Sequence, residues 1–336
     1  MLVTAITGAC ACSHSHLEGA AGDSPAGRFF TMKTLDQTVS SKRMFVVPEK
    51  ILVATDLADT DYLIPHAVAQ ARACGSSLTV AHVIPPGQAM PLDASAIPYL
   101  DVAEMRQEAE QTLKRVAAQA EGSGIPCDIV VVEGNPREQI TTLARDLGAG
   151  RIIAGTHGRR HLTKLLLGSV AHEILRSAEV PVCTIGPHAH EASSFGAPRR
   201  ILHPVSLCAG YEGSARIAIE MAQFYRADIT LLHVLSHSVQ SQPDADRVVE
   251  WTKSEMRRVI PEEAPLWTSI TVQVEVGDVV DEVLNVAAEI GADLIVLGVN
   301  GDASFWPIRG DDTVYNIIAQ AKSPVLSIRH TTVAGA

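Results

Sequence analysis

The chain has 336 residues, enough for two domains with cores of their own. Apolar residues make up 46% and aromatic residues only 4%, so small aliphatic side chains fill those cores, as is typical of helices packed on a parallel sheet. The formal net charge of −11 argues against a nucleic-acid partner, and the lack of a long apolar run argues against a membrane. Six irregularly spaced cysteines indicate reduced thiols and hence a cytoplasmic protein.

Residues 1–48 differ from the rest of the chain. Gly, Ala, Ser and Thr dominate there without sustained apolar periodicity, so we expect a disordered or poorly ordered extension. This segment contains Cys10, Cys12, His14 and His16, all of them side chains that bind soft metals. Zinc sites usually draw two well-separated ligand pairs onto a folded knuckle, and one short cluster leaves the geometry unspecified. We therefore predict no metal site.

From residue 50 onward, short apolar runs alternate with segments of helical periodicity. This alternation predicts an α/β domain, in which a doubly wound parallel sheet carries helices on both faces. Ligands in such sheets bind beyond the carboxyl ends of the strands, where the strand order switches. The predicted strands are Ile51–Thr55, Leu78–Val83, Cys127–Val132, Arg151–Ala154 and Pro181–Ile185, with helices at 60–74 and 101–121 and others beginning at Pro136 and Ser169.

A glycine-rich loop follows the fourth predicted strand. Gly155 and Gly158 are separated by two residues, and Gly168-Ser169 follows nine residues later. Glycines let the backbone approach an anion and adopt positive φ, while Ser169 is a suitable N-cap for the helix that continues with Val170. Because a helix N-terminus attracts phosphate, the loop indicates an anion cradle. The spacing is neither that of a Walker A loop nor that of a dinucleotide fingerprint.

This Gly-x2-Gly-x9-Gly-Ser spacing resembles the nucleotide-binding motif of the universal stress protein family, in its ATP-binding branch. The resemblance covers residues 50–186 and implies that ATP is bound here, alone or with Mg²⁺. It also implies contacts from Asp56, after the first strand, and from Val83, on the adenine side after the second. A simpler interpretation is that the glycines and Asp56 only turn the chain. The implied nucleotide-binding residues are Asp56, Val83, Gly155, Gly158, Gly168, Ser169 and Val170.

The same pattern returns after a polar linker at residues 188–198. Ile229–Val234 repeats Leu78–Val83, and Ser323–Ile328 repeats Val180–Ile185. The chain therefore resembles a tandem universal stress protein with domains at 49–187 and 199–330. We expect two five-stranded parallel sheets arranged as a pseudo-two-fold pair. In this family the fifth strand typically pairs with its counterpart, which implies that Val182–Ile185 and Val325–Ile328 meet within the chain; a homodimer of whole chains is left open.

The two copies differ where the chemistry is expected. Ser206 replaces Asp56, and the second loop ends in Gly310-Asp311-Asp312, so that an aspartate replaces Ser169. A phosphate at that place would meet two carboxylates, and one like-charge contact at about 4 Å costs roughly 4 kcal/mol at an effective dielectric of about 20. The sequence thus predicts one nucleotide-binding domain and one structural partner.

No nucleophile–base pair or carboxylate cluster is evident in the sequence, so we assign no catalytic residue. His82 and His233 lie in apolar strands, where we expect core histidines. Three functions remain open. The chain is a regulatory stress-response protein that senses or buffers adenine nucleotide, a nucleotide-independent interaction scaffold, or a weak ATPase or ATP pyrophosphatase-like enzyme. The family resemblance favours the first.

Overall fold

The computed structural model describes residues 45–86, 102–156, 167–186, 189, 197–207, 210–241, 243–266, 268–300 and 313–330. Its strands are β1 (Lys50–Ala54), β2 (Ser77–Ile84), β3 (Cys127–Glu133), β4 (Arg151–Gly155), β5 (Val182–Ile185), β6 (Arg200–Pro204), β7 (Asp228–Leu235), β8 (Ile270–Val276), β9 (Leu294–Asn300) and β10 (Val325–His330). Its α-helices are α1 (Thr60–Cys74), α2 (Val102–Gly122), α3 (Pro136–Asp146), α4 (Ser169–Ser177), α5 (Tyr211–Tyr225), α6 (Ala245–Arg257), α7 (Val279–Glu289) and α8 (Thr313–Gln320).

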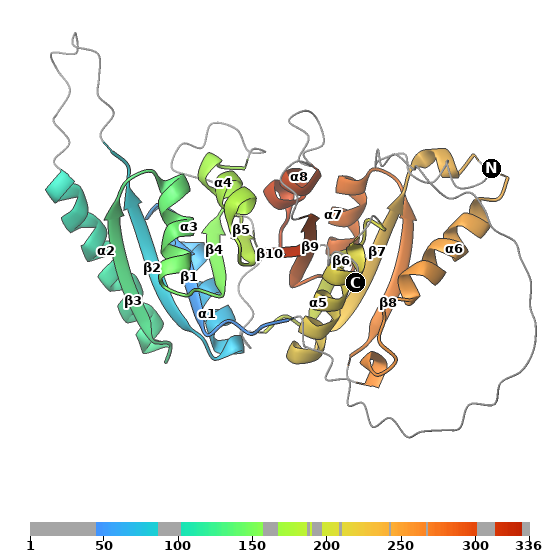
Figure 1. Cartoon of the computed structure of the whole chain (residues 1–336), viewed down its shortest axis with the longest axis horizontal. Coiled ribbons are helices and arrows are strands. Elements are labelled where there is room, and N and C mark those ends of the chain that lie inside the picture. Colours follow the sequence, from blue (N-terminus) through green and yellow to red (C-terminus); the bar gives the residue numbers. More distant parts are fainter. Residues whose placement is uncertain are drawn as a thin grey trace, which may run out of the picture. The chain divides into compact units, whose positions relative to one another are not determined.

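All ten strands belong to one sheet, in the order β3-β2-β1-β4-β5-β10-β9-β6-β7-β8 (Figure 1). We call residues 45–189 the first half and residues 197–330 the second half. Neighbouring strands are parallel within each half, and β5 and β10 pair antiparallel between the halves. β5 and β10 thus pair where the sequence analysis expected Val182–Ile185 and Val325–Ile328 to meet, and this pairing joins the two expected five-stranded sheets into a single sheet.

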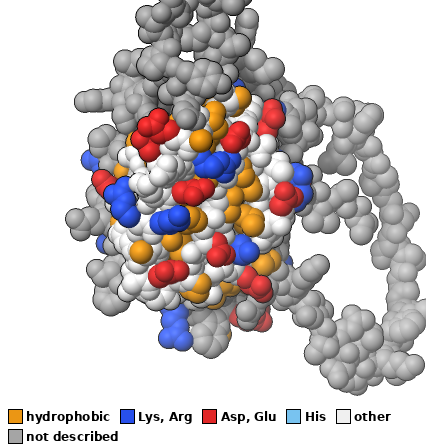
Figure 2. All heavy atoms as spheres, turned by 90° about the vertical axis from the view of Figure 1, so that its left-hand side faces the viewer, with side chains coloured by type: hydrophobic (Ala, Val, Ile, Leu, Met, Phe, Trp, Pro, Cys, Tyr) orange, Lys and Arg blue, Asp and Glu red, His pale blue; other side chains and the backbone are white. Residues whose placement is uncertain are grey.

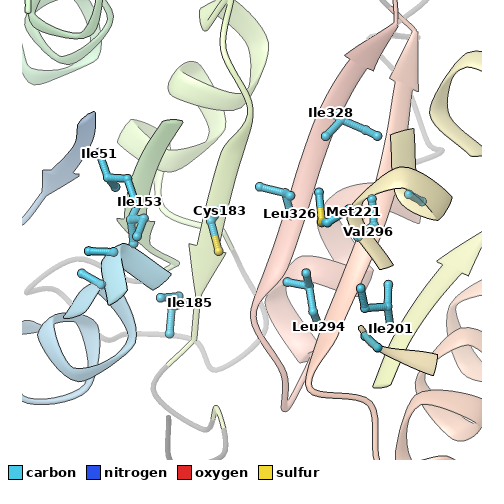
Figure 3. Packing of buried hydrophobic residues seen from close by; sticks show 14 of the residues in the cluster. Ile51, Ile153, Cys183, Ile185, Ile201, Met221, Leu294, Val296, Leu326 and Ile328 are labelled. Carbon is cyan, nitrogen blue, oxygen red and sulfur yellow. The ribbon is translucent and has the colours of Figure 1, made fainter. Parts of the chain in front are cut away.

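Helices cover both faces of this sheet. Residues of α1, α2, α5 and α6 pack in one hydrophobic layer, and residues of α3, α4, α7 and α8 pack in the other. Each layer continues across the junction between the halves. Figure 3 shows Ile153 and Cys183 on one side of this junction and Leu326 and Val296 on the other, all within the same buried cluster. The two halves thus share their core.

The repeated sequence pattern produces repeated local structure. The helix α3 begins at Pro136, as predicted, and Asn135 caps it with a side chain that accepts the Arg137 N–H at 3.2 Å. Asp278 caps α7 in the same way and accepts the Val280 N–H at 2.9 Å. The duplication therefore extends to the residues that begin corresponding helices.

The described surface shows no dominant charge over α2 and β3. Acidic and basic side chains are interspersed on this face (Figure 2). No described helix combines the length and the apolar character needed to cross a bilayer.

We predict that Leu326→Ala destabilises the whole sheet, because Leu326 is 1% exposed and lies opposite Cys183 at the junction. A buried Leu→Ala change costs about 2–5 kcal/mol, to be measured as the free energy of unfolding in urea. The control is Val46→Ala, since Val46 is 77% exposed and should contribute little. A loss below about 1 kcal/mol at Leu326 would contradict the shared core.

Candidate functional site

Most of the sequence-predicted site residues come together at one edge of the sheet. Strand β1 lies between β2 and β4, and all three run in the same direction. Their carboxyl ends therefore bring Val83, Asp56 and Gly155 to the same edge, and α4 begins beyond β4 with Ser169. This is also where the strand order reverses, the usual ligand position in a doubly wound fold. Gly158 lies outside the described residues.

Asp56 and Val83 differ in exposure. Asp56 is partly exposed, and its Oδ1 accepts the Ala58 N–H at 2.9 Å. Asp56 thus stabilises the turn after β1, while Asp59 occupies the N-cap position of α1. Val83 is only 5% exposed, and its side chain packs in the layer beneath α3 and α4. A ligand at this edge would therefore meet the backbone of Val83.

Gly155 and Gly168 do not have the positive φ angles expected from the sequence. Gly168 has φ −60° and ψ 144°, which is extended backbone open to any residue. At Gly155 the reason for glycine is a close neighbour, because a Cβ there would lie 2.5 Å from Asp59 Oδ2 and 3.1 Å from the Tyr62 hydroxyl. The protein's own packing therefore requires a glycine at position 155.

The start of α4 also differs from the prediction by one residue. Gly168 is the N-cap, and Ser169 is the first helical residue, with an exposed side chain. Two hydrogen bonds fix this register: the Gly168 N–H donates to the Thr156 carbonyl at 2.8 Å, and the Gly168 carbonyl accepts the His172 N–H at 2.9 Å. The first N–H groups of α4, including those of Ser169 and Val170, have no acceptor within the helix.

A polar cluster that the sequence analysis did not identify lies beneath this edge. The Thr55 hydroxyl donates to Asp59 Oδ1, and Thr55 Oγ1 accepts the Leu57 N–H at 2.9 Å. Asp59 is 5% exposed, and burial raises the pKa of its carboxyl to about 6, although the Thr55 hydrogen bond opposes this shift. Burial and the neighbouring Asp59 raise the pKa of Tyr62 well above its usual value, so the phenol stays neutral.

Among the described residues, this cluster occurs in the first half and has no counterpart in the second. Val205 follows β6 where Thr55 follows β1, and Gly210 is the N-cap of α5 where Asp59 is the N-cap of α1. The only sequence signal for the cluster was a threonine and an aspartate four residues apart after the first strand, a pattern equally typical of an ordinary helix start.

The two strand histidines are partly buried rather than core residues, and each contacts a backbone carbonyl. His82 Nδ1 lies 2.9 Å from the Thr55 carbonyl oxygen, and His233 Nδ1 lies 2.6 Å from the Val205 carbonyl oxygen. Burial lowers the pKa of His233. Across the described ranges, no three His, Cys, Asp or Glu side chains come together in a way that could hold a metal ion. The cluster from Cys10 to His16 lies outside those ranges.

Comparison with known proteins agrees with this architecture. The model of the universal stress protein family matches residues 48–185 and again residues 198–329. The chain belongs to the universal stress protein family. Because the family model matches twice, the chain is a tandem member, and each match covers the five strands of one half.

Individual universal stress proteins match one half or both. One from Methanocaldococcus jannaschii is 28% identical over 138 residues, which are 41% of this chain and 81% of the relative. Another from the same organism is 27% identical over 158 residues, or 42% of this chain and 97% of the relative. The crystal structure of a universal stress protein from Archaeoglobus fulgidus superposes with a TM-score of 0.64 and 19% identity, covering 84% of this chain and 99% of that one. This last likeness shows that the fold is shared.

We predict that Gly155→Ala destabilises the protein by about 1–3 kcal/mol, because the new methyl group would collide with the Asp59 carboxylate. Urea unfolding of Gly155→Ala, Asp59→Ala and the double variant measures this contact, and the double variant should lose less than the sum of the two singles. Gly122→Ala is the matched control, since a Cβ there meets no atom within 4 Å. Strictly additive losses would show that the contact is unimportant.

Asp59 should also make stability depend on pH. Its pKa is raised from 3.8 to about 6 in the folded protein, so the native state binds this proton more tightly than the unfolded state. Stability is therefore highest below pH 4 with respect to this group, and roughly 3 kcal/mol is lost as the pH rises through 6. Asp59→Asn should remove this dependence. The free energy of unfolding of the variant, minus that of wild type, should therefore be larger at pH 7.5 than at pH 4.5.

The measurement is urea unfolding of both proteins at the two pH values. Asp61→Asn is the matched control, because Asp61 is an exposed carboxylate in the first turn of the same helix. If the difference between wild type and Asp59→Asn is the same at both pH values, the buried carboxyl does not titrate in this range.

Proposed function

We propose that this chain is a regulatory stress-response protein that senses or buffers adenine nucleotide. In this proposal residues 49–187 form the domain that binds ATP, residues 188–198 form a linker, and residues 199–330 form a structural partner. The observation that carries the proposal is the convergence of β1, β2, β4 and the N-terminus of α4 at one sheet edge. That edge combines an anion-attracting helix end with a partly exposed carboxylate.

The residues at this edge suit the two ends of a nucleotide. The N–H groups of Ser169 and Val170 and the exposed Ser169 hydroxyl would receive the phosphates, with Gly155, Gly158 and Gly168 leaving space for them. The Asp56 carboxylate would accept hydrogen bonds from the nucleoside, and the Val83 backbone would face the adenine. Mg²⁺ usually binds through substrate phosphates and waters, so it would need no dedicated protein ligands here.

Differences between the halves support a single nucleotide site. The second half has Ser206 at the position of Asp56, and Gly210 rather than a carboxylate is the N-cap residue of α5. Its sequence also places Asp311 and Asp312 at the position of Ser169, outside the described residues. Like charges there would repel a phosphate.

We further propose that the halves form a pseudo-two-fold pair, the intramolecular analogue of a symmetric dimer. The register of β5 and β10 supports this arrangement. Cys183 lies opposite Leu326, its counterpart in the repeat, while Val182 pairs with Ser327 and Thr184 pairs with Val325. Val182 and Val325 are counterparts in the repeat, and so are Thr184 and Ser327, so the pair Val182–Ser327 corresponds to the pair Val325–Thr184 with the halves exchanged. A two-fold axis between Cys183 and Leu326 would produce this register.

One observation favours the interaction scaffold as a second candidate. The need for glycine at position 155 is explained by Asp59 and Tyr62, with no nucleotide involved. In that alternative, the loop is kept for packing alone, and purified protein would carry no adenine nucleotide.

Gly168→Val should test the ATP proposal, because a branched side chain at the N-cap of α4 would crowd the approaching phosphates. Titration calorimetry should give one ATP per wild-type chain and at least tenfold weaker binding for the variant, in line with the loss of one charge-assisted hydrogen bond. Gly122→Val is the control, since space is open around Gly122.

Each other outcome has a definite meaning. Equal affinity in both proteins would show that α4 does not hold the phosphates. Two bound ATP molecules per chain would contradict a structural second half. Wild-type protein that binds no ATP would support the scaffold.

A further inference from the structure

A cavity of about 310 Å³ lies between the two halves. It is separate from the proposed nucleotide site, since none of the residues assigned to the nucleotide is among its described lining residues. The first half contributes residues of α1 and the start of β4, and the second half contributes the end of α5 and the segments that lead into β6, β9 and β10. The lining residues are His66, Ala69, Gln70, Arg151, Ala197, Pro198, Arg200, Tyr225, Gly291, Ala292, Asp293, Leu294, Ser323, Pro324 and Leu326.

The wall of this cavity contains a buried cation without a counter-ion. Arg151 is only 4% exposed. One of its terminal nitrogens donates to Gln70 Oε1 at 3.0 Å, the Tyr225 hydroxyl is a further hydrogen-bond partner, and Nε has no acceptor among the described residues. None of the ion pairs among the described residues includes Arg151. A charge in such a place is strongly unfavourable unless an anion compensates it.

Tyr225, Cys183 and Gln70, which lie around Arg151, do not supply that negative charge. Burial raises the pKa of Tyr225 far above neutrality, and burial also raises the pKa of Cys183, whose thiol accepts from Gln70 Nε2 at 3.1 Å. Phenol, thiol and amide are therefore all neutral at physiological pH. They orient the guanidinium, but they leave its charge in place.

The duplication shows that the fold itself does not need this cation. Leu294 is the first residue of β9, the position that Arg151 has in β4. Met221 is the eleventh residue of α5, the position that Gln70 has in α1. Both counterparts lie in the hydrophobic core, where Figure 3 shows them on the far side of the junction from Cys183. Because apolar residues fill the equivalent places, packing alone does not explain Arg151 and Gln70.

The rest of the lining also favours a small anion. Arg200 is exposed, and its guanidinium lies over Gly291, where a Cβ would come within 3.1 Å of it. The opposing carboxylate, Asp293, is already engaged, since its Oδ2 accepts the backbone N–H groups of Arg199 and Arg200 at 2.9 and 3.0 Å. Two arginines against one carboxylate leave a net positive lining. Alanine, proline and leucine side chains line much of the remaining wall, together with His66 and Ser323.

We propose that this cavity binds a small organic anion whose carboxylate or phosphate group pairs with Arg151 and whose body packs on the apolar walls. The cavity volume is near the lower end of the range for ligand pockets, which suits a compact metabolite. A water molecule could satisfy the Nε hydrogen bond but not the charge. Since both halves line the cavity, its ligand would hold them together, a role independent of ATP in the first half.

The test uses the full chain in a Tris-chloride buffer and three probes at millimolar concentration: benzoate, its neutral analogue benzamide, and inorganic phosphate. Thermal unfolding and titration calorimetry should show that benzoate binds and raises the melting temperature, while benzamide does neither. Binding of inorganic phosphate as well would show that the oxyanion head is sufficient, whereas binding of benzoate alone would identify a carboxylate with an apolar body.

Two variants assign the effect to this cavity. Arg151→Met should bind benzoate at least tenfold more weakly and should fold, because the second half has Leu294 at the equivalent position. Ala197→Phe fills the cavity from the linker side while keeping Arg151, and it should lose binding too. Arg115→Met removes an exposed arginine of α2 and should bind as wild type does. Gly168→Val should also be unaffected, which separates this proposal from the nucleotide site.

The proposal is overturned if neither benzoate nor phosphate binds wild-type protein. It is equally overturned if benzamide binds as well as benzoate does, or if both cavity variants keep wild-type affinity for the anion.

Discussion

The pairing of β5 with β10 is the contact on which the rest of the structure depends. An apolar edge strand leaves unpaired N–H and C=O groups that invite aggregation, and β5 is only four residues long with Pro181 before it. Because β10 covers this edge, both hydrophobic layers continue from one half into the other. The stacked rings of His172 and Tyr315, with centroids 4.4 Å apart, add a contact between α4 and α8. Neither half could separate without exposing this shared core.

Within that shared frame, the two halves bury different polar groups. The first half buries Asp59 beside Gly155, and it buries Arg151 beside Gln70. The second half has Gly210, Leu294 and Met221 at the corresponding positions and forms the same strands and helices. Since burying a charge is unfavourable and the second half forms the same elements without these groups, the fold itself does not require them.

The sequence was sufficient to predict the features that depend on local pattern. Apolar periodicity located the strands and helices, Asn135 and Pro136 located the start of α3, and the repeated segments revealed the tandem family membership. It could not predict that Gly168 caps α4 or that Gly155 faces Asp59, and the meeting of β5 with β10 was expected from the family resemblance alone. Each of these depends on contacts between elements far apart in the chain, such as the hydrogen bond from Gly168 to Thr156 across the loop.

The glycines of the motif therefore differ in how strongly they support a phosphate site. Packing against Asp59 and Tyr62 accounts for Gly155, so this glycine by itself is weak support for a ligand. Gly168 is different, because its dihedral angles are open to any residue and serine, threonine, asparagine or aspartate would cap the helix at least as well. A cap without a side chain leaves the first N–H groups of α4 accessible, which benefits an incoming anion more than it benefits the helix. The N-terminus of α4 is thus the chief feature that favours phosphate binding, and the buried cluster beneath Gly155 fixes the strand end from which the loop departs.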